Sequence, residues 1–598
     1  MPQRAFARII GVVSDTAQAE KLPLRVKLSY GAPSFAGAGM AIPIAIHLTI
    51  FYSDVILVPL GIIAIVKALA RALDALTDPV MGWITDSTRT RWGRRRPWIV
   101  IGAPLAALSF YLMFSPPAEL SGMNAAAWFA TTYVCYYIFH TVYIIPHYGL
   151  GPELTLDYNE RSLLFGIREG FVVLGTLVAA VAPPLFIAYT GGEREGYSGF
   201  AALLAALLIL LYVNLVVQVR ERADFVGRPP NPLVPGLRRV MRNRAFRILL
   251  LVYLTSSISG AIPGLMMPYF TKYVLQPEDP NLWLAVYLAT YFGAGFLFLP
   301  MWVFLARRFE KKPVWLASFF PSITGSLLLF TMGEGDILPT FLVLLWAGSA
   351  FGAGLFLGPA MQADVIDYDE LYTGRRREAQ FGALWSIMTK FMVIPSMSIP
   401  LAVLATVGYA PNVPQTEEVQ FAIRAIFGLT PATTAFLAFL IALLYPISRR
   451  VHRQIWEGIE CHKRGEYATD PITDHRLPPM QDRNIGEEEG WFLDHFSMGE
   501  LRLVASRGAG ALRRRILLLQ LASMFVLVWA LLALAGEVSL DQDPGILAVI
   551  HVVIAGIALA SLVFHFLRWR AAGRLNTMTS ADITAHRQMN QMLMEGGA

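Results

Sequence analysis

The sequence predicts an all-α integral membrane protein, and three observations lead to that fold class. Of the 598 residues, 55% are apolar and only 15% are charged, whereas about a quarter of an average soluble protein is charged. The mean hydropathy is +0.51. Runs of about 20 apolar residues, each long enough to cross roughly 30 Å of hydrocarbon as a helix, recur along the chain with short breaks. This pattern excludes a soluble multidomain enzyme.

Twelve of the apolar runs form two sets of six, separated by a polar stretch. The first set predicts spans at 29–53, 57–84, 97–115, 124–150, 163–189 and 198–219. The second set predicts spans at 248–273, 281–306, 313–332, 337–361, 381–409 and 420–447. RWGRRRP (91–97), after the second span, is echoed by RFEKKP (308–313), after the eighth. A six-helix unit is therefore used twice, as in transporters built from parallel repeats.

Two further apolar runs, Ile516–Gly536 and Ile546–Leu567, raise the expected number of spans to fourteen. Between them and the twelfth span lies a mixed polar stretch, in which we expect short helices and loops. The expected organisation is a cytoplasmic N-terminal segment (1–28), a six-helix bundle (29–219), a central cytoplasmic loop (220–247), a second six-helix bundle (248–447), a cytoplasmic segment (448–512), a two-helix membrane hairpin (513–570) and a cytoplasmic tail (571–598).

Basic residues gather in alternate breaks between the spans. The break after the second span holds five arginines and the stretch 220–247 holds eight, whereas the other set of breaks is almost free of them. Basic loops face the cytoplasm, so an even number of spans places both termini there, in a plasma (inner) membrane. The net charge of +6 therefore reflects topology, and we expect the bilayer rather than nucleic acid as a partner. Two cysteines exclude a disulfide framework and a Cys-based metal site.

The second predicted span carries four ionisable residues, Lys67, Arg71, Asp74 and Asp78. Each ionisable residue inside a span costs roughly 2.5–3.5 kcal/mol on insertion scales, so a function is expected. Asp74, Thr77 and Asp78 recur at i, i+3 and i+4, which places them on one helix face. Their oxygens can bind a monovalent cation such as sodium, or the carboxylates can share a proton. The alternative is that Arg71 merely neutralises Asp74.

Several long motifs resemble those of the glycoside-pentoside-hexuronide:cation symporters, the melibiose-permease-like branch of the major facilitator superfamily. They are KLSYGAPSF (27–35), FYSDV, ALDALTDPVMGWITDSTRTRWGRRRPWIVIG, IIPHYGLGPELTLDYNERS and ADVIDYDE (363–370). The resemblance covers roughly residues 25–455. It implies a major facilitator fold of two six-helix bundles, here with two extra C-terminal helices. It also implies transport rather than enzymatic activity, with no cofactor and with sodium or protons as the coupling ion.

The resemblance also assigns roles to residues. The cation site falls on Asp74, Asp78 and Thr77, completed by Thr141 of the fourth span. A cytoplasmic gate falls on two motifs, whose members are Asp86, Arg91, Arg94, Arg95, Asp364 and Asp367. For these residues a solvated loop position is the alternative. Asp54, which closes the first span, could have a helix-end or solvated role as readily as a coupling role.

Five residues are candidates for contact with the substrate. Lys390 lies deep in the eleventh span, where the family has a buried lysine, with snorkelling of its side chain as the alternative. Arg168 matches a family arginine near the substrate, although Glu169 could simply pair with it. Tyr137, Tyr148 and Trp385 could stack on a sugar ring or line an apolar slot. Packing within the membrane is the alternative for each aromatic ring.

Two departures from the family concern the substrate. Where a galactoside-binding member has acidic residues that accept hydrogen bonds from sugar hydroxyls, this chain has Ala38 and Ile144. These side chains cannot accept hydrogen bonds, which argues against melibiose itself. The expected function is cation-coupled symport of a sugar or glycoside-like small molecule by alternating access. The alternatives are a cation-coupled lysolipid or amphiphile transporter and a non-transporting membrane sensor that uses the C-terminal extension.

Overall fold

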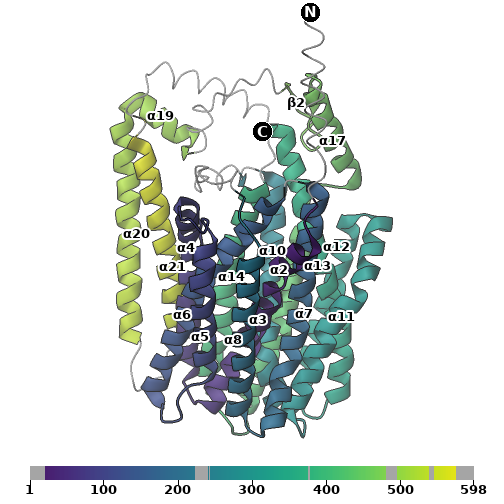
Figure 1. Cartoon of the computed structure of the whole chain (residues 1–598), viewed down its shortest axis with the longest axis vertical. Coiled ribbons are helices and arrows are strands. Elements are labelled where there is room, and N and C mark those ends of the chain that lie inside the picture. The colour runs from purple at the N-terminus through teal and green to yellow at the C-terminus, as the bar shows by residue number, and fades with distance from the viewer. Residues whose placement is uncertain are drawn as a thin grey trace, which may run out of the picture. The chain divides into compact units, whose positions relative to one another are not determined.

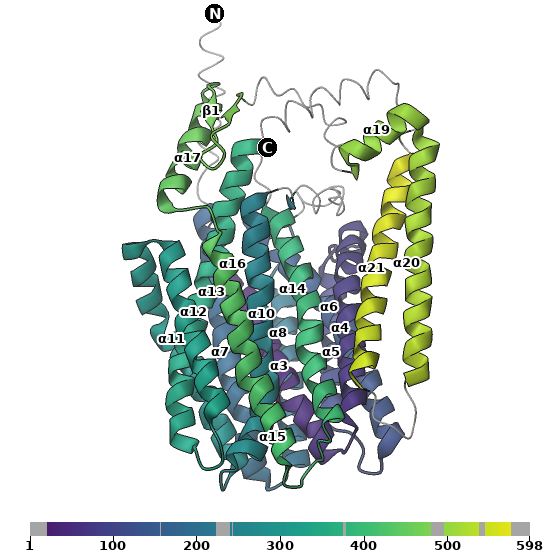
Figure 2. The same ribbon diagram turned by 180° about the vertical axis from the view of Figure 1, so that it is seen from behind.

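The computed structural model describes residues 21–155, 157–222, 240–241, 243–374, 378–479, 495–537, 545–573 and 575, which are almost entirely helical (Figures 1 and 2). Most of the predicted N-terminal segment, central loop and C-terminal tail lie outside the described residues, as does the connection inside the predicted C-terminal hairpin.

The first half of the chain folds into long helices that match the first six predicted spans. They are α2 (Leu24–Gly31), α3 (Pro33–Ile50), the π-helical turn η1 (Phe51–Val55), α4 (Leu60–Ser87), α5 (Arg96–Phe114), α6 (Gly122–Leu154), α7 (Tyr158–Thr190) and α8 (Glu193–Gln218). The first span begins before residue 29, because α2 starts at Leu24 directly after Pro23. A proline before the first turn is favourable, since the first N–H groups of a helix have no intrahelical partner.

The second half repeats this pattern. Its elements are α10 (Arg244–Phe270), η3 (Thr271–Leu275), α11 (Pro280–Phe309), α12 (Lys311–Thr331), α13 (Ile337–Thr373), α14 (Glu378–Thr406), α15 (Glu417–Arg424), η4 (Ala425–Leu429) and α16 (Thr430–Leu443). Asn243 and Asp279 cap α10 and α11, because their side chains accept hydrogen bonds from the backbone N–H groups of Phe246 and Leu282.

Twelve helical segments of the described chain are long and apolar enough to cross a membrane, including the two C-terminal ones. Among the fourteen predicted spans, α4 and α6 fall outside this group, although they have 28 and 33 residues and are long enough. Charged side chains in α4 account for its lower hydropathy. These two helices also carry the predicted cation-binding residues, so the shortfall in hydropathy coincides with the candidate site.

The described residues after the last core span include the short helices expected there, α17 (Arg449–Lys463) and α19 (Met498–Arg507). They also include a two-stranded antiparallel hairpin that was not expected, formed by β1 (Ala468–Thr469) and β2 (Arg476–Leu477). A capping box of Ser497 and Glu500 begins α19. Burial acts to raise the pKa of Glu500, but hydrogen bonds from Ser497 and the ion pair with Arg568 lower it overall.

The buried side chain of Asp470 attaches the β1–β2 hairpin to α13. Its Oδ2 accepts hydrogen bonds from the hydroxyls of Tyr368 (3.0 Å), Tyr372 and Thr473. Its Oδ1 accepts one from the backbone N–H of Ile472 (2.9 Å). Tyr368 and Tyr372 lie at the end of α13, so one carboxylate connects the extension to a core span.

The C-terminal hairpin consists of α20 (Ala509–Glu537) and α21 (Ile546–Ala572), which lie side by side (Figures 1 and 2). The hydroxyls of Ser523 and Ser561 are 2.9 Å apart and join the two helices. Helix α21 also packs against α14, and its Gly556 lies against Ala72 of α4. The extension therefore contacts two core helices that carry predicted site residues.

The chain divides into two compact units. The first contains the residues up to Leu48, Thr77–Leu120, and the stretch from Ala127 to the central loop. The second contains Thr49–Leu76, Ser121–Ala126 and the chain from Asn231 onward. Helix α4 contributes to both, with Asp74 in the second unit and Asp78 in the first.

Replacing Asp470 with alanine should release the hairpin from α13. Three hydroxyls and one N–H would lose a charged acceptor, and each hydrogen bond to a charged group contributes about 1.5–3 kcal/mol. We expect the free energy of local opening at residues 468–477 to fall by at least about 2 kcal/mol, measured by hydrogen–deuterium exchange. The exposed Asp474→Asn substitution is the matched control. Unchanged exchange in Asp470→Ala would contradict the assigned role.

Candidate functional site

Helix α4 is continuous through its four ionisable residues, and each described charge in its first half has a partner. Lys67 is fully buried, and its ammonium donates a hydrogen bond to the hydroxyl of Thr49 at 2.7 Å. Buried charges are retained in proteins when they are paired or hydrogen-bonded. Lys67 is thus inside the protein rather than facing lipid.

Asp74 lies between two cations. It is 1% exposed, and its Oδ2 is 2.9 Å from the ammonium of Lys390 on α14 and 3.7 Å from the guanidinium of Arg71. The pairing of Arg71 with Asp74, which was the alternative interpretation of this motif, is therefore present. The second cation, from a helix more than 300 residues away in sequence, goes beyond that alternative.

Asp78 lies one turn later on α4 and contacts α6. The hydroxyl of Thr141 donates a hydrogen bond to Asp78 Oδ1 at 3.0 Å, and the hydroxyl of Thr77 lies 3.4 Å from that of Thr141. Thr141 is 1% exposed, whereas Thr77 and Asp78 are half-buried. The structure thus brings three predicted cation-binding residues together. Carboxylate and hydroxyl oxygens are suitable ligands for a hard monovalent cation.

The predicted substrate residues in the first half of the chain differ in exposure. Tyr137 is buried in a cluster of rings, 5.0 Å from Tyr133 between centroids. Tyr148 is 48% exposed, and the guanidinium of Arg168 lies 5.1 Å from its ring centroid. Arg168 also forms an ion pair with Glu169, which was the alternative to a substrate-binding role for this arginine.

Trp385 packs within the second half of the chain. Its ring centroid is 4.0 Å from that of Tyr253, and it lies against a hydrophobic core to which α10–α14, α16 and α17 contribute. It is half-buried. One face of this ring is therefore used for packing, which is the alternative role for a membrane aromatic residue.

The predicted gate in the loop between α4 and α5 is an ion-pair network. Asp86 lies 3.5 Å from Arg94 and 3.6 Å from Arg95, and both arginines also pair with Glu153 of α6, at 2.6 Å for Arg95. Arg94 and Arg95 are buried, whereas Arg91 is exposed and pairs with no carboxylate in the described part of the chain. The network is thus built around two of the three predicted arginines.

Glu221 is a member of this network that was not predicted from the sequence. Its carboxylate accepts hydrogen bonds from the backbone N–H groups of Arg94 (2.8 Å), Arg95 (2.9 Å) and Arg96 (2.9 Å), at the start of α5. Gly93 has φ +109°, and a Cβ there would lie 2.3 Å from a carboxylate oxygen of Glu221. The sequence offers one indirect signal of such a partner. Helix α5 begins shortly after a glycine and has no capping side chain of its own, so its first N–H groups need an acceptor from elsewhere.

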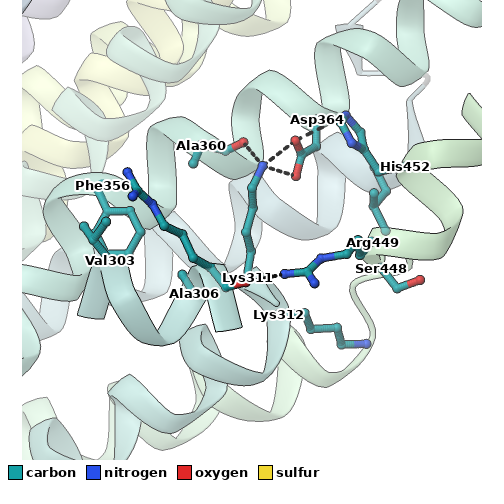
Figure 3. Close-up of a pocket in the computed structure, with 12 residues that line it drawn as sticks. Val303, Ala306, Lys311, Lys312, Phe356, Ala360, Asp364, Ser448, Arg449 and His452 are labelled. Carbon is teal, nitrogen blue, oxygen red and sulfur yellow. Dashed lines mark hydrogen bonds and ion pairs between the residues drawn. The ribbon is translucent and has the colours of Figure 1, made fainter. Parts of the chain in front are cut away.

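The predicted gate residues of α13 contact the start of α12 and α17 (Figure 3). Lys311 donates hydrogen bonds to both carboxylate oxygens of Asp364, at 2.6 and 2.8 Å. His452 Nε2 lies 3.4 Å from Asp364 and 3.0 Å from Asp367. Asp364, Asp367 and His452 are close enough to hold a metal ion. Because the Lys311 ammonium already neutralises Asp364, this geometry fits an ion-pair network better than a metal site.

Asp54, whose role the sequence left open, is the centre of a buried cluster. Its Oδ2 accepts hydrogen bonds from Lys272 (2.6 Å) and from the hydroxyl of Tyr273, and its Oδ1 accepts one from Tyr409 (2.6 Å). Asn412 donates to the Asp54 backbone carbonyl at 2.6 Å. Asp54 is 5% exposed, so a solvated helix end is the wrong description of this residue.

Two π-helical turns shape this cluster. Asp54 lies in η1 and both Lys272 and Tyr273 lie in η3. Such turns often occur at functional sites. Sequence periodicity could not reveal them, because each lasts only five residues at the end of a regular helix.

Comparison with known proteins identifies the family. The family model described as MFS/sugar transport protein matches residues 29–449, which is more than half of the chain. The putative glycoside/cation symporter YagG of Escherichia coli is 27% identical, over 76% of this chain and 99% of that protein. The sodium-dependent lysophosphatidylcholine symporter 1 of Gallus gallus is 27% identical, over 73% of this chain and 89% of that protein.

Solved structures agree on the fold. A crystal structure of a mutant of the nucleoside transporter NupG superimposes with a TM-score of 0.53 at 13% identity, covering 70% of this chain and 99% of that one. At this identity the likeness shows the fold alone, which is the major facilitator fold. The chain belongs to the MFS/sugar transport protein family and is a multi-pass membrane transporter that couples its substrate to a cation, not an enzyme.

Proposed function

We propose that the chain carries out symport of a sugar or glycoside-like solute with sodium or a proton, by alternating access. The observation that supports this proposal most strongly is the buried carboxylate of Asp74 on α4, held at 2.9 Å by Lys390 of α14. In an ion pair of this kind, another cation can displace the lysine ammonium from the carboxylate. Asp74, Asp78, Thr77 and Thr141 are the proposed cation ligands.

Lys390 and the coupling ion would compete for Asp74. One carboxylate carries one negative charge, so a sodium ion or proton that binds there removes most of the electrostatic attraction for the ammonium. Lys390 is then released and can face the substrate. Because each ligand binds better when the other is present, the coupling is reciprocal in free energy.

The hydroxyls of Thr141 and Thr77 favour sodium over a proton as the coupling ion, because sodium binds several oxygen ligands at once. They lie within hydrogen-bonding distance of Asp78 or of each other and could turn their lone pairs toward sodium. A proton would instead bind a carboxylate oxygen directly. The two ions therefore predict different pH dependences of substrate binding.

Alternating access requires contacts that close the protein at opposite ends of its spans. Asp54 follows the first span and Asp86 follows the second, so the chain topology places their networks at opposite ends of the helices. The positive-inside rule assigns the arginine-rich end, with Asp86, to the cytoplasm, in a plasma (inner) membrane with both termini inside. We assign the gate at the outer end to the Asp54 cluster, and the gate at the inner end to the Asp86 network and to Asp364 and Asp367.

An amphiphile such as a lysolipid is the second candidate substrate. Ala38 and Ile144 offer no acceptor for sugar hydroxyls, and the relative from Gallus gallus is named for lysophosphatidylcholine. Arg168, beside the exposed ring of Tyr148, offers a cation for a phosphate or a polar headgroup. The substrate class is therefore the main question for experiment.

The cation site can be tested with ligand-induced thermal stabilisation of the purified protein. Asp78→Asn and Asp74→Asn each remove a charged ligand. Each should therefore raise the sodium concentration needed for half of the stabilisation at least about tenfold, which is about 1.4 kcal/mol of binding free energy. Asp279→Asn, at an exposed helix cap, should leave it unchanged. Substrate classes are compared in the same assay with glycosides, uronates and lysolipids, at two pH values.

Transport in proteoliposomes completes this test. If both aspartate variants retain full cation-dependent uptake of the substrate that stabilises the wild type, the proposed site is wrong. If only lysolipids stabilise the protein, the sugar proposal is replaced by the amphiphile one.

Lys390→Gln separates competition from simple structural support. Removing the competing ammonium should raise the apparent affinity for the coupling ion about tenfold, or about 1.4 kcal/mol, while uptake falls because the substrate loses a contact. Titration of thermal stability with sodium or with pH measures the first effect. Weaker cation binding in Lys390→Gln would contradict competition, and Lys463→Gln, at an exposed lysine of α17, is the control.

Asp54→Asn should favour the state that is open at the Asp54 end. Loss of the charge paired with Lys272 removes about 2 kcal/mol of closing free energy, a shift of about thirtyfold in population. Distances between spin labels at the exposed Leu57 and Val413 would report the opening. Glu278→Gln is the nearby control, and an unchanged distance distribution would contradict the gate.

A further inference from the structure

A basic pocket of 520 Å³ lies where α11 ends, α12 begins and α17 starts (Figure 3). Its polar lining includes Arg307 from α11, Lys311 and Lys312 from α12, and Arg449 and His452 from α17. Its apolar lining comes from α11, α13 and the segment before α17, and consists of Val303, Ala306, Phe356, Ala360 and Ile447. This pocket is separate from the residues proposed to bind the coupling ion and the substrate.

The lining carries an excess of positive charge. Four of its residues are arginine or lysine, and Asp364 is the only carboxylate among the described lining residues. Asp364 is already neutralised, because Lys311 donates to both of its oxygens. Arg307, Lys312 and Arg449 therefore provide three positive charges that the carboxylate of the lining does not balance.

These cations also stabilise helix ends, which is the ordinary explanation for their presence. Lys312 donates to the carbonyls of Leu443 and Tyr445, and Arg449 donates to the carbonyl of Arg307. An ammonium has three donors and a guanidinium has five. Helix capping thus leaves donors on both side chains, and the exposed guanidinium of Arg307 adds more.

The position of the pocket indicates which anion would bind. It lies between the ends of two candidate membrane spans, Pro280–Phe309 and Lys311–Thr331, where phospholipid headgroups meet water. The apolar part of its lining can contact the first carbons of acyl chains. Basic pockets between transmembrane helices on the cytoplasmic side are typical binding sites for anionic lipid headgroups.

We propose that this pocket binds the phosphate of an anionic phospholipid, with Arg307, Lys312 and Arg449 as the donors. Lipid bound there would bridge α11 and α17, and would hold the extension near the start of α12. The chain would therefore be stabilised by anionic lipid in the leaflet that the positive-inside rule assigns to the cytoplasm.

The test uses the purified full chain and measures its unfolding temperature with added lipid. Phosphatidylglycerol should raise this temperature more than phosphatidylcholine does. Arg307→Gln and Arg449→Gln should each raise the phosphatidylglycerol concentration needed for half of the stabilisation at least about fivefold. Arg308→Gln and Arg450→Gln remove the same charge from exposed neighbours outside the pocket and should retain the effect.

Three outcomes would overturn the proposal. One is an equal loss of stabilisation in the neighbouring control variants, which would indicate general surface charge. Another is stabilisation by inorganic phosphate alone that phosphatidylglycerol does not exceed, which would indicate a site for a free anion. The third is an unchanged number of bound phosphatidylglycerol molecules in both Arg307→Gln and Arg449→Gln, measured by native mass spectrometry.

Discussion

Neutralising carboxylates inside the membrane is the constraint on which the rest of this structure depends. An uncompensated charge in a span is costly, and Asp74 is retained because Lys390 and Arg71 surround it. Helix α14 must therefore stay close to α4 at this point. In the proposed mechanism, a coupling ion that took over the role of Lys390 would weaken this link between the two helices, so ion binding and helix movement would be one event.

The other networks use the same principle away from the middle of the spans. Asp54, Asp364 and the carboxylate of Glu153 each pair with cations from a different helix. Ion pairs with several partners can be exchanged one at a time, which would suit the gating role proposed for these networks. The tyrosines around Asp54 act as hydrogen-bond donors in this buried cluster.

The fold could be predicted from the sequence because membrane spans are local features. The apolar runs correspond to the core helices, and the spacing of Asp74, Thr77 and Asp78 placed them on one face of α4. Partners that come from distant positions could not be predicted in this way. Glu221 is 127 residues from Arg94, and Asp470 is 102 residues from Tyr368. No periodicity links such pairs, and the β1–β2 hairpin depends on one of them.

The contact between α21 and α4 also restricts how the two helices can vary in evolution. A methyl group added at Gly556 would lie 3.3 Å from the Cβ of Ala72, closer than nine in ten such contacts. Neither position can become larger without displacing α21 or α4. Relatives that have this C-terminal hairpin should therefore keep small residues at both positions, whereas relatives without it face lipid there and are free to carry larger side chains.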